Sequence, residues 1–295
     1  MARIHQLKQY RKLHCFYKNY LFLCPDKKFT FFREDHKQWI VTTNAYGERI
    51  TKRASGKNQY NQEIWFIGDS ISFGYLVSDE NTTPYLLDLY QDIPVRNLGV
   101  DSIGTLGILN RLQKALKDHP DTKIQYLFWI YNTSDFTDDI IENNQNHIRK
   151  SLFFLHYNLG KISNIYNTIF LLKKELSRNN TIPETISINS DIQNFNHITY
   201  KNIIKLYKYI LSEKRIKNFL IIVYPGMNIK TKKPDIDSTV TLSLYQFLKQ
   251  QNIPVLNVFS EFTHSQNPYF TFDGHPSEEG YNIFTKVLIA HLKHL

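Results

Sequence analysis

Three residues at two distant places in the chain could together perform nucleophilic chemistry. Ser70 ends the stretch IWFIGDS, and Asp273 and His275 lie near the C-terminus in FDGHP. A serine hydroxyl attacks poorly at neutral pH unless a histidine takes its proton, and the histidine needs a carboxylate to fix its tautomer. Ser70, His275 and Asp273 are therefore candidates for nucleophile, general base and orienting carboxylate.

Each of these motifs is common by itself. Gly-Asp-Ser is often only a turn that caps a helix, and Asp-Gly-His-Pro is often an ordinary turn. Their positions distinguish them, because the first motif ends the first apolar run and the second precedes the last helical stretch. Ligands of open parallel sheets bind at the carboxyl ends of the strands, so we expect the two motifs to meet there.

An alternation of short apolar runs and amphipathic stretches begins at about residue 64 and predicts an α/β fold. We expect a flavodoxin-like three-layer sandwich with a parallel five-stranded sheet that is buried on both faces. The predicted strands are 64–70, 95–100, 124–131, 219–225 and 254–260. The predicted helices are 83–90, 105–119, 200–215, 238–251 and 278–295.

Two regions do not follow this alternation. Residues 1–63 are predicted to be an N-terminal extension of short strands and turns, packed on the main domain of residues 64–295, with a surface loop in KRASGKNQYNQ. Residues 136–199 are predicted to be an insertion that ends in a mobile Asn/Ser-rich loop at 178–196. Its apolar segment 152–172 is interrupted by polar residues, so we expect a buried core helix, a lid or an acyl-chain groove, and no membrane span.

Composition and charge limit the remaining classes. A hydrophobic content of 42% excludes a disordered chain, and a net charge of +9 spread along the sequence indicates a basic face without a nucleic-acid partner. Cys15 and Cys24 have no ligand pattern around them and are predicted to be plain thiols. No signal peptide is recognised, so the expected location is cytoplasmic, or outside the cell by another export route.

The motifs together resemble the SGNH (GDSL-like) hydrolase superfamily over residues 64–295. The resemblance rests on IWFIGDSISFGYLVSDENT, RNLGVDSIGTLGILNRL and FDGHPSEEGYNIF, in that order, with the bacterial lead-in WIVTTNAYGERIT before them. It implies that Ser70 is the nucleophile and that Asp273 and His275 complete the triad. Only Gly274 separates the Asp from the His, where most members have two residues.

The resemblance also implies an oxyanion hole, and here this chain departs from the usual pattern. The family uses the nucleophile's own amide (Ser70), a glycine amide after the second strand and an asparagine side chain after the third. In this chain Ser102 stands in the glycine position, with Gly104 two residues later, and Ser134 stands in the asparagine position, with Asn132 as the alternative. One missing donor lowers turnover by about a hundred- to a thousandfold.

The expected activity is a serine esterase or deacylase that cleaves an oxygen ester, with a slight preference for O-acetylated carbohydrate and with no cofactor or metal. A lipase or lysophospholipase, a sugar O-acetyltransferase and a catalytically inactive carbohydrate-binding module are the alternatives. The expected partner is a small-molecule, lipid or carbohydrate ester. Peripheral membrane contact and the oligomeric state stay open. Tyr75 could line the pocket or pack in the core, and Asp138 and Asp139 could assist binding or cap the next helix.

Overall fold

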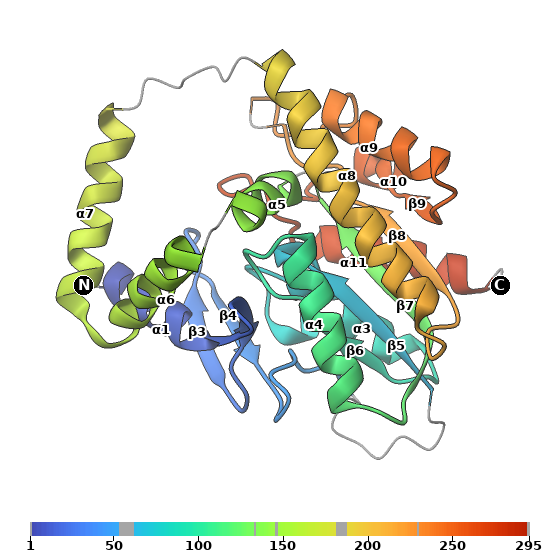
Figure 1. Cartoon of the computed structure of the whole chain (residues 1–295), viewed down its shortest axis with the longest axis horizontal. Helices are drawn as coiled ribbons and strands as arrows, with labels where there is room; N and C mark the ends of the chain where they lie inside the picture. The colour runs from blue at the N-terminus through green and yellow to red at the C-terminus, as the bar shows by residue number, and fades with distance from the viewer. Residues whose placement is uncertain are drawn as a thin grey trace.

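A parallel sheet of five strands forms the centre of the molecule in the computed structural model (Figure 1). The model describes residues 2–52, 62–132, 134–144, 147–180, 188–228 and 230–293. The strands are β5 (Gln62–Gly68), β6 (Val95–Asn97), β7 (Lys123–Tyr131), β8 (Phe219–Val223) and β9 (Val255–Asn257). Their order is β6-β5-β7-β8-β9, and every neighbouring pair is parallel. This order is that of a flavodoxin-like sheet, in agreement with the predicted fold class.

Helices cover both faces of the sheet, with α4 and α8 on one side and α3 and α11 on the other (Figure 1). The predicted helices correspond to α3 (Thr83–Tyr90), α4 (Thr105–Asp118), the second half of α8 (Ile188–Ser212), α9 (Thr239–Gln250) and α11 (Glu278–Lys293). Short elements that were not predicted are α2 (Ser70–Phe73), η1 (Asp79–Asn81) and α10 (Phe259–His264), the last of which replaces the end of the fifth predicted strand. The central strands β5 and β7 are mostly buried, with exposed residues only at their starts, so the α/β prediction is confirmed.

The N-terminal region begins with a helix, where the sequence indicated only strands and turns. Its elements are α1 (Ala2–Leu13), β1 (His14–Tyr17), β2 (Tyr20–Leu23), β3 (Lys28–Phe32) and β4 (Gln38–Thr42), and β1-β2 and β3-β4 form two antiparallel hairpins. The helix was missed because its apolar residues are few and its side chains are mostly basic or amide. Residues 53–61, within the predicted surface loop, lie outside the described residues.

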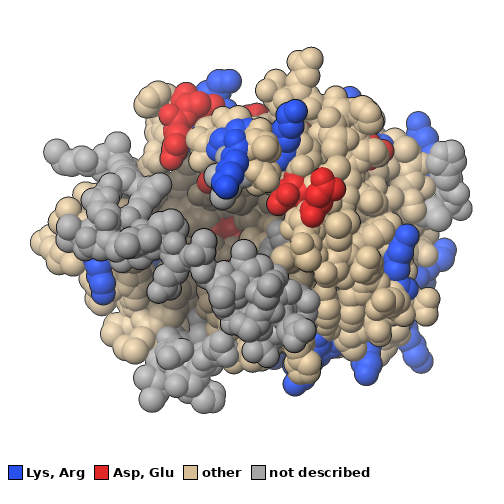
Figure 2. Space-filling view, turned by 90° about the horizontal axis from the view of Figure 1, so that it is seen from above, with Lys and Arg blue, Asp and Glu red and all other residues tan. Residues whose placement is uncertain are grey.

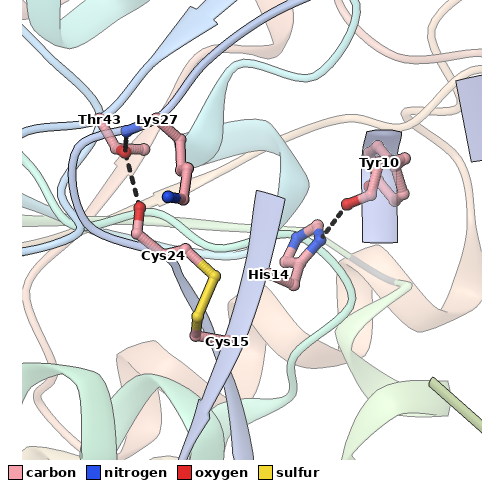
Figure 3. The surroundings of a disulfide bond; sticks show 6 residues. All are labelled: Tyr10, His14, Cys15, Cys24, Lys27 and Thr43. Carbon is pink, nitrogen blue, oxygen red and sulfur yellow. Dashed lines mark hydrogen bonds between the residues drawn. A yellow bond between two sulfur atoms is a disulfide. The ribbon is translucent and has the colours of Figure 1, made fainter. Parts of the chain in front are cut away.

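The prediction of two plain thiols is wrong, because Cys15 and Cys24 form a disulfide (Figure 3). The β1-β2 hairpin pairs Cys15 with Phe22 and so returns the chain beside it at Cys24, with 4.9 Å between the two Cα atoms. Thr43 Oγ1 donates a hydrogen bond of 2.7 Å to the Cys24 carbonyl and connects the bridge to the segment after β4. The pairing depends on the hairpin, which the cysteine count could not indicate.

A fully buried arginine joins the N-terminal region to the nucleophile's helix. Arg49 forms an ion pair of 2.8 Å with Asp79 and donates to the carbonyls of Phe73 and Gly74, the last turn of α2, at 2.8 and 2.6 Å. It also donates to the carbonyls of Ile40 and Val77. The four-residue helix α2 therefore has its carboxyl end held by a cation, which complements the helix dipole.

The predicted insertion is helical. It contains α5 (Asp135–Asn144), α6 (His147–Ile162), α7 (Asn164–Asn180) and the start of α8. The apolar segment 152–172 is neither one helix nor fully buried, because the chain breaks at Ser163 and several of its large side chains are exposed. The predicted loop 178–196 is wrong at both ends, which belong to α7 and α8, and residues 181–187 lie outside the described residues. No helix in the described part of the chain is both long and apolar enough to cross a membrane.

Candidate active site

The nucleophile candidate lies on a tight turn between β5 and α2. Gly68 has φ of +145°, and a Cβ there would lie 2.7 Å from the Ile130 carbonyl oxygen on the neighbouring strand, so only glycine fits. Asp69 caps α2 by accepting a 3.0 Å hydrogen bond from the Ile71 amide. Gly74 ends the helix in the left-handed conformation. Sequence and packing together leave Ser70 as the first residue of a short helix at the carboxyl edge of the sheet.

The acid and base candidates lie on a second tight turn, just before α11. Gly274 has φ of +92°, which allows the chain to reverse between Asp273 and His275 with one intervening residue. The buried Tyr224, at the end of β8, donates a 3.0 Å hydrogen bond to the Gly274 carbonyl. The Phe270 amide donates to the His275 carbonyl at 2.9 Å. The turn is thus fixed to the same edge of the sheet as Ser70.

The structure brings the three predicted residues into a chain of hydrogen bonds. His275 Nε2 lies 2.8 Å from Ser70 Oγ, and His275 Nδ1 is hydrogen-bonded to Asp273 Oδ1. Burial acts to raise the pKa of Asp273, but the hydrogen bond and charge of His275 hold that pKa below its usual value. The ionised Asp273 can only accept, so Nδ1 carries the hydrogen and Nε2 is free to accept the Ser70 proton.

The carboxylate of Asp69 lies among the polar groups that surround the candidate nucleophile and accepts hydrogen bonds from some of them. Its Oδ2 lies 3.2 Å from Ser70 Oγ, whose single hydrogen points to the nearer His275 Nε2, and it accepts from Asn132 Nδ2 at 3.1 Å and from Ser134 Oγ at 3.5 Å. Asn132 Nδ2 also donates to Ser134 Oγ at 2.6 Å, so both amide hydrogens of Asn132 have acceptors. Ser134 is exposed, and its own hydrogen has only the distant acceptor at 3.5 Å. Of these two predicted donors, Ser134 is the one that can turn toward a bound carbonyl.

A second buried carboxyl group, that of Asp135, lies next to Asp69. Burial raises the pKa of Asp69, and burial together with the charge of Asp69 raises the pKa of Asp135 well above its usual value. Two adjacent buried carboxyl groups cannot both ionise, so we take Asp135 as the protonated member. Asp135 Oδ2 accepts a 3.2 Å hydrogen bond from the backbone amide of Asn132. Acidic atoms are also visible in the hollow near the centre of the molecule seen from above (Figure 2).

The loop after β6 contains the two remaining predicted oxyanion donors, and the structure separates them. Ser102 is exposed and has φ of +59°. Gly104 donates its amide to Glu142 Oε1 at 2.9 Å, so this donor already has an acceptor. Glu142 also accepts from the amides of Leu106 and Gly107. It therefore caps α4, and burial raises its pKa to about 8.

The acidic residues of α5 cap a helix, but not the one expected. Asp139 accepts from the Thr105 amide at 2.7 Å and from Thr105 Oγ1 at 2.9 Å, at the start of α4. Asp138 and Asp139 were predicted either to assist binding or to cap the helix after them, whereas both lie inside α5. Burial raises the pKa of Asp138 to about 7 and that of Asp139 to about 6. Asp135, Asp139 and Glu142 recur at helical spacing, which is the signal that could have predicted one acidic face on this helix.

Two contacts that the sequence did not indicate connect the N-terminal region to the site. His14 Nε2 lies 2.5 Å from Asp101 Oδ1, next to Ser102, and His14 Nδ1 lies 2.9 Å from the Tyr10 carbonyl. Burial lowers the pKa of His14 to about 3 and raises that of Asp101 to about 7. Nδ1 must donate to the carbonyl, so Nε2 carries no hydrogen and accepts a hydrogen bond from the protonated Asp101 carboxyl group. This pair fixes the loop that carries the Ser102 amide.

Tyr75 forms the second connection and answers the question that the sequence left open. Its ring packs against the His275 ring at 4.8 Å and against the Trp39 ring at 5.3 Å between centroids. Burial and the charge of Asp273 raise the pKa of Tyr75 to about 12. The Tyr75 side chain is therefore uncharged at neutral pH and packs against the His275 ring. Among the described residues, no group of three or more His, Cys, Asp or Glu side chains is arranged to hold a metal ion.

Comparison with known proteins gives similarity at the level of solved structures. No family model matches the chain, and no curated protein matches it. A member of the lipolytic protein G-D-S-L family from Veillonella parvula is 15% identical with a TM-score of 0.45, over 79% of this chain and 100% of that one. An acetyl xylan esterase from Geobacillus stearothermophilus is 12% identical with a TM-score of 0.43, over 77% of this chain and 93% of that one.

A carbohydrate esterase whose active site displays divergent catalytic and non-catalytic binding functions is also similar. It is 14% identical with a TM-score of 0.48, over 92% of this chain and 85% of that one. The G-D-S-L name is that of the family which the sequence motifs resemble. Because each of these TM-scores is below 0.5, the activity proposed below is argued from the side chains of this chain's own site.

Proposed function

We propose that this protein is a serine hydrolase that cleaves an oxygen ester, with Ser70 as nucleophile. The observation that carries the proposal is the continuous hydrogen-bond chain from Ser70 through His275 to Asp273. Each member comes from a turn whose backbone geometry needs a glycine, and both turns lie at the carboxyl edge of one parallel sheet. A helix-capping serine requires no histidine, so the capping role alone does not account for this arrangement.

The reaction follows from these three groups. Ser70 Oγ attacks the ester carbonyl carbon as its proton passes to His275 Nε2, and Asp273 stabilises the imidazolium that forms. The tetrahedral intermediate expels the alcohol, which takes the proton from Nε2, and leaves an acyl group on Ser70. Water then enters and gives one proton to His275. Its oxygen attacks the acyl carbon, and collapse of the second intermediate returns the proton to Ser70 and releases the acid.

We assign the oxyanion hole to the amides of Ser70 and Ser102 and the hydroxyl of Ser134. Support comes from the use of the other candidates elsewhere, because Gly104 donates to Glu142 and the Asn132 amide group donates to Asp69 and Ser134. Asn132 then acts as a positioning residue that holds Ser134 in place. A neutral hydroxyl that can rotate is a less preorganised donor than a fixed amide, so we expect slow turnover.

The substrate proposal is an O-acetylated carbohydrate, as the sequence resemblance predicts. A non-catalytic carbohydrate-binding module is the second candidate, and the observation that favours it is the serine in the usual asparagine position. A sugar O-acetyltransferase would use the same three residues. It would show acyl transfer to a sugar acceptor that exceeds hydrolysis.

Hydrolysis of p-nitrophenyl acetate, butyrate and octanoate by wild type, Ser70→Ala and Ser260→Ala tests the proposal. Ser260 is an exposed serine on α10 and serves as the matched control. Circular dichroism verifies the fold of each protein. We expect activity and fluorophosphonate labelling in the wild type and the control, and neither in Ser70→Ala. Folded wild-type protein that neither cleaves the esters nor reacts with fluorophosphonate would refute the hydrolase and favour the binding module.

A further inference from the structure

Helix α7 exposes a row of large aliphatic side chains at the edge of the molecule. We define the outer stripe as Ile165, Ile169 and Leu172, whose spacing of four and three residues places them on one side of α7, together with Ile162 at the end of α6. They are between 59% and 75% exposed. Figure 1 shows α7 at the margin of the molecule, beside α6 and α1 and away from the sheet.

The opposite side of α7 is firmly packed, so the outer stripe is not the result of a loosely attached helix. Asn167 is fully buried and donates a 2.7 Å hydrogen bond to the Gly160 carbonyl. The Phe170 ring lies 4.9 Å from the His156 ring and 5.0 Å from the Arg11 guanidinium carbon. These contacts fix which side faces outward. Monomeric proteins seldom leave such a continuous row of Ile and Leu in water, so a partner is expected to cover it.

The charges around the outer stripe are mostly positive, with Glu175 on α7 as the exception next to Lys173 and Lys174. Residues 1–25, which form α1 and the first hairpin, contain five Lys or Arg and no Asp or Glu, and residues 143–174 likewise contain five and none. Helix α1 packs against both α6 and α7. Lys12 and Lys18 are exposed on α1 and the hairpin, and Lys173 is exposed beside the stripe. A second copy of the chain would bring like charges together, whereas an anionic surface would not.

We propose that the outer stripe docks on an anionic lipid bilayer, with α7 lying in the interface plane. An amphipathic helix with aliphatic residues on one face and Lys on its flanks binds bilayers by inserting the first and pairing the second with lipid phosphates. The proposal adds a location to the proposed esterase and does not depend on its activity. Docking there would place the protein on a membrane surface.

Co-sedimentation of the full chain with vesicles tests the docking. The vesicles contain phosphatidylcholine alone, or phosphatidylcholine with phosphatidylglycerol. The test variant combines Ile165→Asn, Ile169→Asn and Leu172→Asn. The matched control combines Leu89→Asn, Leu211→Asn and Leu242→Asn, three exposed leucines on other helices. Hydrolysis of p-nitrophenyl acetate and circular dichroism verify that both variants fold, and co-sedimentation itself needs no activity.

We expect wild type and control to bind vesicles that contain phosphatidylglycerol and to be partly released by salt. The partition coefficient of the stripe variant onto these vesicles should be at least about tenfold lower, because the variant loses three inserted aliphatic groups. Equal binding by the stripe variant and the control, or no wild-type binding to either vesicle, would overturn the proposal. A wild-type dimer in sedimentation velocity that the stripe variant alone dissociates, without vesicle binding, would assign the stripe to a second copy instead.

Discussion

Replacement of Ser134 by alanine tests the reassigned oxyanion donor directly. Asn132 has two amide hydrogens, and both are used at 3.1 Å and 2.6 Å, whereas the Ser134 hydrogen has only an acceptor at 3.5 Å. If Ser134 turns this hydrogen toward the tetrahedral intermediate, its loss removes one of three donors. Removal of one such donor typically costs about 2.7–4 kcal/mol of transition-state stabilisation.

The assay is steady-state hydrolysis of p-nitrophenyl acetate by Ser134→Ala. We expect kcat to fall by about a hundred- to a thousandfold with KM nearly unchanged, because the donor acts on charge that develops only in the transition state. The exposed position of Ser134 implies little change in unfolding free energy. Ser134→Thr keeps the hydroxyl and should recover part of the rate, and Ser260→Ala controls for loss of an exposed serine.

The refuting result is specific. If Ser134→Ala stays within about threefold of wild type while folded Asn132→Ala loses its activity, then Asn132 itself donates to the oxyanion and the hydrogen-bond assignment is wrong. If both variants lose activity, two measurements separate the donor from the positioning residue. These are the relative changes in kcat and KM and the unfolding free energy of each variant. Asn132 is buried, so its replacement should also lower the unfolding free energy, and that of Ser134 should not.

Three further predictions concern the connections of the N-terminal region. Arg49→Met should lower the unfolding free energy in urea by about 3–5 kcal/mol, because Asp79 and four carbonyls lose a buried cation, and an unchanged midpoint would contradict this. In wild type, the pair of His14 and Asp101 binds one proton between about pH 4 and 6.5 in both states. The proton is on Asp101 in the folded protein and on His14 in the unfolded chain. Because the number of bound protons is the same, the pair adds no pH dependence to the unfolding free energy. Asp101→Asn leaves His14 alone, with a pKa of about 3 in the fold against 6.5 in the unfolded chain. Urea unfolding of this variant should show stability that is complete above pH 6.5 and lost toward pH 3 by up to about 1.4 kcal/mol per pH unit, and a pH dependence equal to that of wild type would refute the shared proton. Reduction of the Cys15–Cys24 bridge should cost about 2 kcal/mol, with Cys15→Ser in place of the reductant as the check, and identical thermal midpoints with and without reductant would count against any stabilising role.

The predicted sheet was correct because its signals are local. Apolar runs of strand length alternate with amphipathic stretches of helix length, and the runs at β5 and β7 are mostly buried in the sheet that results. The predictions failed where composition was a weak guide to conformation. The Asn/Ser-rich residues 188–196 are helical in α8, and the basic N-terminus forms α1. In α1, packing against α6 and α7 overrides the preference of the isolated segment.

The catalytic candidates divide in the same way. The sequence by itself determined Ser70, Asp273 and His275, because a nucleophile, a base and an acid at the ends of the first and last predicted strands must converge when the strands are parallel. It also showed that Ser102 and Ser134 stand in unusual positions. The first statement needs only residue type, order and periodicity, and the second is what the resemblance to the SGNH family implies.

Only the tertiary structure decided which donors are free. Whether Gly104 can serve an oxyanion depends on Glu142, 38 residues away in the chain, and whether Asn132 can do so depends on Asp69, 63 residues away. The Arg49 contacts and the His14–Asp101 pair are equally distant in sequence. Hydrogen-bond capacity is limited to a few hydrogens per group, and the acceptors that occupy them are chosen by packing, which local periodicity does not encode.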